Sequence, residues 1–340
     1  MPNGAQNLPS VGGRRMGLNA SLGLLNVGPV LILVLLVAVS AMSTSAFLRP
    51  VNLANIFAQT AVIATVAIGQ QFVILTRGID LSVGSNLALA TVIGGLVYKS
   101  WDSSVLVILA MLAGGALVGL ANGVGYVFGR LPHPFIMTLA TLSVCRGLAL
   151  ELSVGHTTMR GMPSGVQFLG DSGLFGLDNG VFIVVAVAAL AAMVARRMVW
   201  GRWIYAVGGD PQAARRMGIP VNGVLISTYV LSGLCAGIGA VLLSGRTGAS
   251  SPLYGDLLEL DTIAAVIIGG ASFLGGRGHV GHALVGALMI GVIRNALNLN
   301  NVDVYFQMIA IGLIIVLAVE ADVLRGRLER QARTMQAAQS

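Results

Sequence analysis

Long apolar runs that are nearly free of charged residues recur along almost the whole chain. A hydrocarbon core about 30 Å thick is crossed by roughly 20 helical residues, and most of these runs reach that length. A helix satisfies its backbone hydrogen bonds within its own segment, which a bilayer requires. The sequence therefore predicts an all-α polytopic membrane protein.

The composition leaves no room for a soluble domain of useful size. Of the 340 residues, 56% are hydrophobic and 10% are charged, whereas soluble proteins carry roughly 25% charged residues. We expect a cytoplasmic N-terminal tail over 1–26, a transmembrane domain over 27–324 and a cytoplasmic C-terminal tail over 325–340. The first apolar run is expected to stay as an anchor, because the tail before it is too polar for a signal peptide.

We expect about ten transmembrane helices, and the apolar segments lie at 27–47, 53–76, 83–98, 105–128, 135–152, 181–199, 224–243, 262–273, 282–297 and 305–324. The eighth is too short to span comfortably. A short, glycine-flanked segment of this kind is typical of a broken helix whose ends are buried in protein or face a water-filled cavity.

The placement of the basic residues predicts the orientation. With a cytoplasmic N-terminus and ten spans, the basic residues in the connections fall mostly on the inner side, and the outer ones are Arg49, Lys99, Arg160 and Arg246. This bias places both termini and a loop at about 200–223 in the cytoplasm. The net charge of +7 thus indicates membrane topology, and we expect no nucleic acid partner.

A short basic helix is predicted within residues 208–220, between two apolar runs. Asp210 is a good N-cap, Pro211 suits the first helical position, and Gly218 followed by Pro220 is a stop signal. A helix of about two turns is marginal alone in water, so it must pack against something. We interpret it as a handle that a soluble partner grips.

Enzymatic and nucleotide-binding motifs are not found. The glycine-rich stretch 269–278 lacks the lysine of a phosphate loop, and the chain's only lysine is Lys99. No metal-ligand spacing joins the four histidines, so we expect no metal, no bound cofactor and no catalysis. The glycines instead allow helices to approach closely, as the four-residue spacing of Gly115, Gly119 and Gly123 indicates.

Acidic residues open two of the apolar segments. Asp80 opens the third, where it either caps the helix or makes a fixed contact with Arg77 or a moving neighbour, and both roles are compatible. Glu259 and Asp261 open the eighth from the opposite side of the membrane. Because an Ile-Gly-Gly follows in both segments, the pattern suggests inverted repeats.

Other polar side chains lie at membrane depth. Arg146, Glu151 and Arg294 would each cost about 2.5 to 3.5 kcal/mol at the centre of a span, so they either pair and snorkel or line a permeation path. Neutral amides and hydroxyls beside them suit a neutral, hydroxyl-rich solute. The candidates for the path and its gate are Gln70, Arg77, Asp80, Ser82, Asn86, Asn122, Thr138, Thr141, Arg146, Asp261 and Asn295.

These motifs, in this order, resemble the membrane permease of bacterial ATP-binding-cassette (ABC) importers for monosaccharides, the ribose-permease-like family. The resemblance covers almost the whole chain after residue 45. It is carried by Gly-Ile-Asp-Leu-Ser-Val-Gly at 78–84, Gly-Leu-Ala-Asn-Gly at 119–123, Leu-Pro-His-Pro-Phe-Ile at 131–136, Thr-Leu-Ala-Thr-Leu at 138–142, Arg-Gly at 146–147, the helix after Asp210, and the stretches 259–270 and 275–278.

The resemblance implies a type II importer permease that moves a pentose, a hexose or a small polyol across the bacterial inner membrane. It implies a homodimer of permeases in the lipid, a cytoplasmic ATPase subunit that holds ATP and Mg, and a periplasmic or lipoprotein sugar-binding protein. The ATPase would grip Gly209, Asp210, Pro211, Ala213, Ala214, Arg215, Arg216 and Gly218. Where the family commonly has Gly and Asn, this chain has Arg77 and Asp210. Weak polar contacts are expected in the path, with affinity left to the binding protein.

Other functional classes account for less of the sequence. An ion-coupled secondary transporter of a small neutral solute needs acidic residues deep in the spans, whereas Asp80, Glu151, Asp261 and Glu320 lie mainly near segment ends. A receptor or scaffold explains the helices but neither the neutral polar positions nor the capped cytoplasmic helix. An integral membrane enzyme has the least support.

Overall fold

The computed structural model describes residues 11–154, 156, 159–171, 173 and 176–337, with the side chains of 11–26, 160, 325 and 328–337 left out. The described helices are α1 (Val11–Ser43), α2 (Pro50–Leu75), α3 (Val83–Ser100), α4 (Ser104–Phe128), α5 (Pro134–Leu152), α6 (Ser164–Gly170), α7 (Asn179–Arg197), α8 (Val199–Gly209), α9 (Pro211–Arg216), α10 (Val221–Thr247), α11 (Leu258–Ile268), α12 (Val280–Leu299) and α13 (Val304–Ala337). Two short strands, β1 (Met159–Arg160) and β2 (Ala249–Ser250), pair antiparallel.

A helix lies at each of the ten predicted segments, so the prediction of a helical multi-pass protein is confirmed. Seven described helices are long and apolar enough to cross a membrane, namely α2, α4, α5, α7, α10, α12 and the Val304–Leu324 part of α13. The apolar Val27–Ser43 part of α1 is shorter. α11 has 11 residues and ends before Gly269 and Gly270, the second of which has φ +107°. The number of ten spans stays a prediction, and α1 and α13 continue into the predicted tails.

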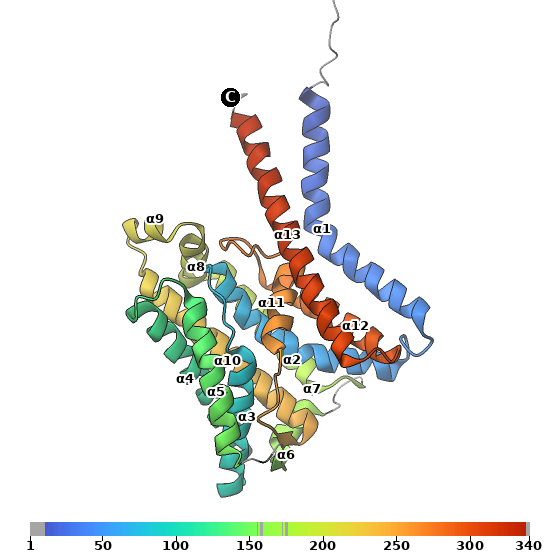
Figure 1. Ribbon diagram of the computed structural model, residues 1–340, viewed down its shortest axis with the longest axis vertical. Helices are drawn as coiled ribbons and strands as arrows, with labels where there is room; N and C mark the ends of the chain where they lie inside the picture. The colour runs from blue at the N-terminus through green and yellow to red at the C-terminus, as the bar shows by residue number, and fades with distance from the viewer. Residues whose placement is uncertain (1–10, 155, 157–158, 172, 174–175, 338–340) are drawn as a thin grey trace, which may run out of the picture.

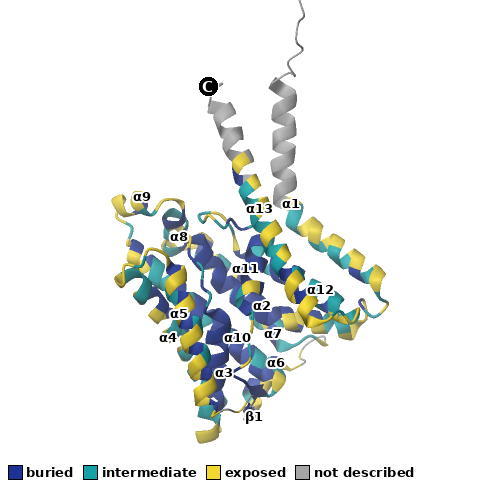
Figure 2. Cartoon of the chain, viewed as in Figure 1, coloured by how far each residue is buried: buried dark blue, intermediate teal, exposed yellow. Residues whose placement is uncertain are grey.

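The core lies where α2 and α10 cross the middle of the bundle (Figure 2). α10 packs against α2, α3 and α4, and the contact with α4 is the most extensive in the described chain. Glycines make this contact close: a Cβ on Gly119 would lie 2.2 Å from the Tyr229 carbonyl oxygen, and one on Gly123 would lie 2.8 Å from the Ile226 Cα. The predicted close helix approach along α4 is therefore confirmed.

The helices before and after the middle of the chain pack in matching ways. α2 packs against α12 as α10 packs against α4, and α2 packs against α11 as α10 packs against α3. α3 likewise contacts α4 and α5, while α11 contacts α12 and α13. The four helices α2 to α5 thus have counterparts, one by one, in α10 to α13.

The bundle has two distinct ends (Figure 1). α8, α9, the start of α1 and the end of α13 lie at one of them, which we call the α9 end, while α6 and the end of α3 lie at the other, the α6 end. α1 is bent (Figure 1), and it contains Pro29, which removes a backbone hydrogen bond from the helix. Between the two ends, α1, α4, α5 and α13 expose many large apolar side chains, as a lipid-facing surface does.

Candidate functional site

The segment over residues 208–220, which we call the capped segment, folds as its sequence predicts. The Asp210 carboxylate accepts hydrogen bonds from the backbone N–H groups of Gln212 at 2.8 Å and Ala213 at 3.0 Å, and Pro211 is the first residue of α9. The Ala213 and Gln212 donors hold the pKa of Asp210 below its ordinary value, so the cap is intact at neutral pH and is lost only as pH falls through that lowered pKa. Gly218, with φ +80°, ends the helix.

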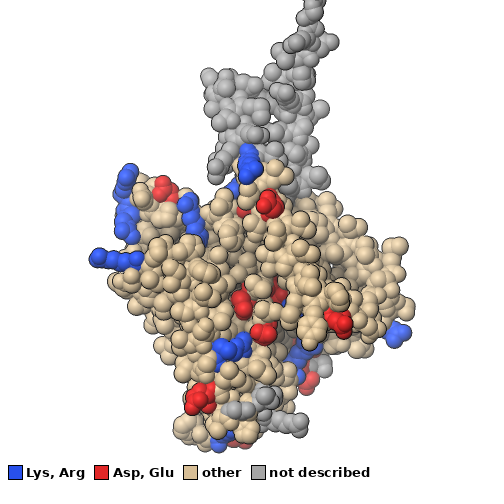
Figure 3. All heavy atoms as spheres, in the orientation of Figure 1, with Lys and Arg blue, Asp and Glu red and all other residues tan. Residues whose placement is uncertain are grey.

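The capped segment presents most of its predicted partner-binding residues to solvent. Ala214 is 4% exposed and anchors α9 against the bundle. A hollow of about 560 Å³ is lined by Pro211, Gln212, Arg215 and Arg216. The exposed residues are Gly209, Asp210, Gln212, Ala213, Arg215, Arg216, Met217, Gly218 and Pro220. Basic side chains gather at this corner of the surface (Figure 3), so the exposed face would complement an acidic partner.

The cap gives a first prediction. Asp210→Ala should lower severalfold the transport that the resemblance implies, because α9 is too short to hold its shape without the two capping hydrogen bonds. Asp210→Asn should keep nearly full transport, because an asparagine oxygen caps a helix as well as an aspartate oxygen. Uptake into proteoliposomes checks both variants, and equal loss in the two would show that charge, and not capping, is what the position supplies.

Arg77 ties the capped segment to the end of α2. Its Nε donates to the Gly208 carbonyl at 2.6 Å, and its Nη2 donates to the Gly209 carbonyl. The contact with Asp80 that the sequence left open is not made, because the guanidinium points toward α8 instead. Arg77 is thus a link between loops at the α9 end.

Asp80 lies at the centre of a buried polar cluster. Its carboxylate accepts hydrogen bonds from Ser82 Oγ at 2.7 Å, from the Ser82 N–H at 3.0 Å and from Ser232 Oγ at 2.9 Å. Asn122 donates to Ser82 Oγ at 2.8 Å, and the Gln70 amide faces the Asp80 backbone N–H and carbonyl at 3.2 Å when oriented to bond both. The expectation that Asp80 is the N-cap of the third segment is wrong: the N-cap of α3 is Ser82, two residues further along the chain.

A second cluster joins α11 and α12 to α2. Arg294 Nη2 lies 2.8 Å from each carboxylate oxygen of Asp261. The next residue, Asn295, exchanges two hydrogen bonds of 2.9 and 2.8 Å with Asn52. Sequence reasoning missed Asn52, because a single amide near the start of an apolar run carries no signal of its own. Arg294 therefore pairs with Asp261. Pairing was one of the two roles expected for it, and lining a permeation path was the other.

The other polar candidates also bond within the chain. Asn86 donates to the Gly115 carbonyl at 3.1 Å, and Thr138 donates to the Ile79 carbonyl at 3.1 Å. Arg146 donates to the Tyr254 carbonyl at 3.0 Å and also to the Pro252 carbonyl, while Thr141 bonds a carbonyl of its own helix. The candidates at most 8% exposed are Gln70, Asp80, Ser82, Asn86, Asn122, Thr138, Thr141, Asp261 and Asn295. A solute would reach them only if the helices moved apart.

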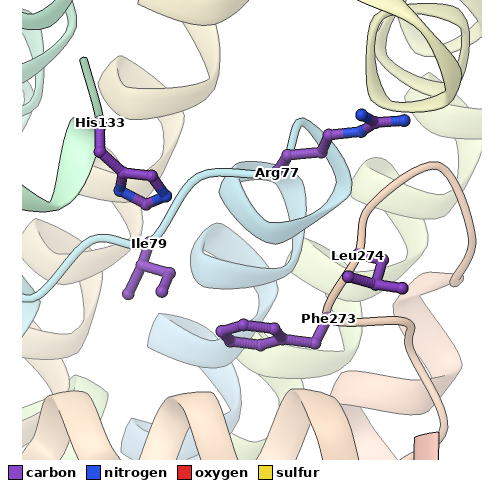
Figure 4. Close-up of a pocket in the computed structure, with 5 residues that line it drawn as sticks. All are labelled: Arg77, Ile79, His133, Phe273 and Leu274. Atoms are coloured by element: carbon purple, nitrogen blue, oxygen red, sulfur yellow. The ribbon is translucent and has the colours of Figure 1, made fainter. Parts of the chain in front are cut away.

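A pocket of about 350 Å³ opens at the α9 end between three loops (Figure 4). Arg77 and Ile79 come from the loop after α2, His133 from the start of α5, and Phe273 and Leu274 from the loop after α11. The Ile79 and Phe273 side chains face each other across it (Figure 4). The apolar pocket residues carried no sequence signal, because an isoleucine or phenylalanine beside a glycine-rich loop is read as the edge of a span.

Comparisons with known proteins give the family of the chain. Residues 52–319 match the family described as branched-chain amino acid transport system, permease component. A ribose import permease of Haemophilus influenzae is 37% identical over 293 residues, covering 85% of this chain and 90% of the relative. A D-allose transport system permease of Escherichia coli is 37% identical over 301 residues, 87% and 90% of the two chains. A fructose import permease of Rhizobium meliloti is 36% identical over 305 residues, 86% and 84%.

Proposed function

Since the chain belongs to the family described as branched-chain amino acid transport system, permease component, we propose that it is the membrane permease subunit of an ATP-driven ABC importer for a monosaccharide or small polyol. The observation that carries the proposal is the match, over at least 84% of both chains, to permeases for three different monosaccharides. The subunit is a transport component and not an enzyme, and ATP is hydrolysed on a separate ATPase subunit.

A neutral solute suits the charges of this chain better than an amino acid does. An amino acid brings a carboxylate and an ammonium group, which need unpaired opposite charges in the path. Here Asp261 and Arg294 pair with each other, Arg146 bonds backbone carbonyls, and Asp80 accepts from hydroxyls. The neutral groups around them would make weak contacts with a sugar once the helices separate, and the binding protein would supply the affinity.

The capped segment is the proposed coupling segment, and it would contact the ATPase. Gly209, Asp210 and Ala213 offer a small, exposed surface for a groove, while Arg215 and Arg216 would meet its acidic rim. The basic residues at the α9 end support a cytoplasmic position for that end and for both termini. The binding protein would then dock at the α6 end, beside the β1–β2 pair.

The matching packing of α2 to α5 and α10 to α13 supports an inverted repeat. Each half carries one buried carboxylate cluster: Asp80 joins α3 to α4 and α10, and Asp261 joins α11 to α12. A second copy of the chain would complete the path, because the polar groups of one copy are closed off by its own helices. A homodimer with closed twofold symmetry is the simplest such assembly.

Reconstituted transport tests the proposal. The chain, its ATPase and its binding protein are placed in proteoliposomes, and ATP-dependent uptake is measured for a panel of labelled monosaccharides and polyols. One solute should accumulate with ATP, and Arg215→Glu/Arg216→Glu should lower its uptake roughly tenfold or more, because reversed charges would repel an acidic groove. Uptake that persists without ATP and stops when the ion gradient is dissipated would identify a secondary transporter instead.

A further inference from the structure

Arg77 occupies a backbone conformation that favours glycine. Its φ is +65°, in the left-handed region where a side chain crowds the backbone. Its guanidinium donates to the carbonyls of Gly208 and Gly209, the last two residues of α8. These carbonyls have no partner within the helix and lie at the negative end of its dipole, where a cation is favoured. The side chain is therefore positioned by specific contacts with the two residues before the Asp210 cap.

The same contact includes a third loop. A Cβ on Gly208 would lie 1.9 Å from the Leu75 carbonyl oxygen and 2.7 Å from the Gly276 nitrogen, so the three backbones leave no room for a side chain. The Gly276 N–H donates to that Leu75 carbonyl at 2.9 Å. The end of α2, the end of α8 and the loop after α11 thus meet at one point, without space to slide independently.

These loops also form two walls of the pocket in Figure 4. Ile79 follows Arg77 by two residues, and Phe273 precedes Gly276 by three. Each wall is fixed from behind: Thr138 donates to the Ile79 carbonyl, and the Phe273 N–H donates to the Asp322 carboxylate of α13 at 3.0 Å. A shift of α8 would pull on the first wall through Arg77 and on the second through Gly276.

We infer that Arg77 is a positioning residue that links the capped segment to the pocket at the α9 end. When the ATPase moves α9, this link opens and closes the pocket, which is the cytoplasmic mouth of the path. The inference rests on the proposed function. A partner can shift the permease between two states only through contacts that differ between those states, and Arg77 supplies the side-chain contact between the moving segment and the Ile79 wall. Without the Arg77 side chain, ATP hydrolysis continues, but fewer hydrolysis events lead to opening or closing of the pocket.

The test measures sugar transported per ATP hydrolysed in proteoliposomes. Arg77→Gly suits the left-handed backbone and removes only the side chain, so the fold should persist. We expect ATP hydrolysis near the wild-type rate and a coupling ratio lowered roughly fivefold. Arg77→Lys, which keeps the charge but lacks the planar fork that bridges two carbonyls, should restore part of the ratio.

Arg130→Gly is the matched control. Arg130 follows α4, also has a left-handed backbone with φ +48°, and makes no hydrogen bond or ion pair to any residue that the structure describes. Its substitution should leave the coupling ratio unchanged. An unchanged ratio in Arg77→Gly, or an equal loss in Arg130→Gly, overturns the inference while uptake by the wild type still supports the importer. Failure of Arg77→Gly and Arg77→Lys alike to assemble with the ATPase would overturn it in favour of a folding role. Absence of ATP-driven uptake by the wild type would instead reject the proposed function itself.

Discussion

Gly233→Val is expected to destabilise the protein by about 3 kcal/mol, enough to remove most of the folded material. A Cβ on Gly233 would lie 2.2 Å from the Gly115 carbonyl oxygen, and a Cβ on Gly115 would lie 2.4 Å from the Gly233 carbonyl oxygen. The two helices thus meet backbone to backbone at this point, and no flexible side chain can yield. Valine would push α10 away from α4 at the contact that holds the core together.

The measurement is the yield of monodisperse protein in detergent, together with the free energy of unfolding where enough protein folds. Gly312→Val on α13 is the matched control, because a Cβ there meets no atom within 4 Å. It introduces the same residue into another apolar helix and should leave both quantities close to the wild type. A Gly233→Val protein as stable as that control would mean that α4 and α10 can separate without loss.

The helices could be predicted from the sequence because their signals are local. Uninterrupted apolar runs gave all ten segments that the structure shows as helices, and the cap at Asp210 needs only its own neighbours to form. The four-residue spacing of Gly115, Gly119 and Gly123 likewise predicted a close approach, since small residues on one helix face permit it. The glycine spacing did not identify α10 as the partner helix, because the choice of partner depends on how all the helices pack together.

The site was harder to predict because its partners are far apart in the chain. Arg77 bonds residues that are 131 and 132 positions away. From the sequence, the carboxylate of Asp80, three residues after Arg77, was the more obvious partner. Asn52 and Asn295 are separated by 243 positions. Of the residues that line the pocket at the α9 end, Arg77 was a predicted gate candidate, but Ile79 and Phe273 were missed, because they acquire a role only where two loops converge.

Breaking the ion pair of Asp261 and Arg294 is expected to lower the stability of the protein by a second large amount. Breaking a buried pair costs about 3 to 5 kcal/mol, because the remaining charge is left without compensation. The two sides of this pair are not equally buried: the Asp261 side chain is 6% exposed and that of Arg294 is 26% exposed. Arg294→Met should therefore approach that full cost, since Asp261 cannot reach water.

Asp261→Asn should cost less than Arg294→Met, because the Arg294 side chain is the more exposed of the two and is long enough to snorkel its charge toward the water interface. The double variant Asp261→Asn/Arg294→Met should be more stable than Arg294→Met alone, since no charge then stays buried. Unfolding of the four proteins in detergent measures all three differences. If the effects of the two substitutions simply add, the pair contributes no mutual stabilisation, and the link between α11 and α12 must depend on their apolar packing instead.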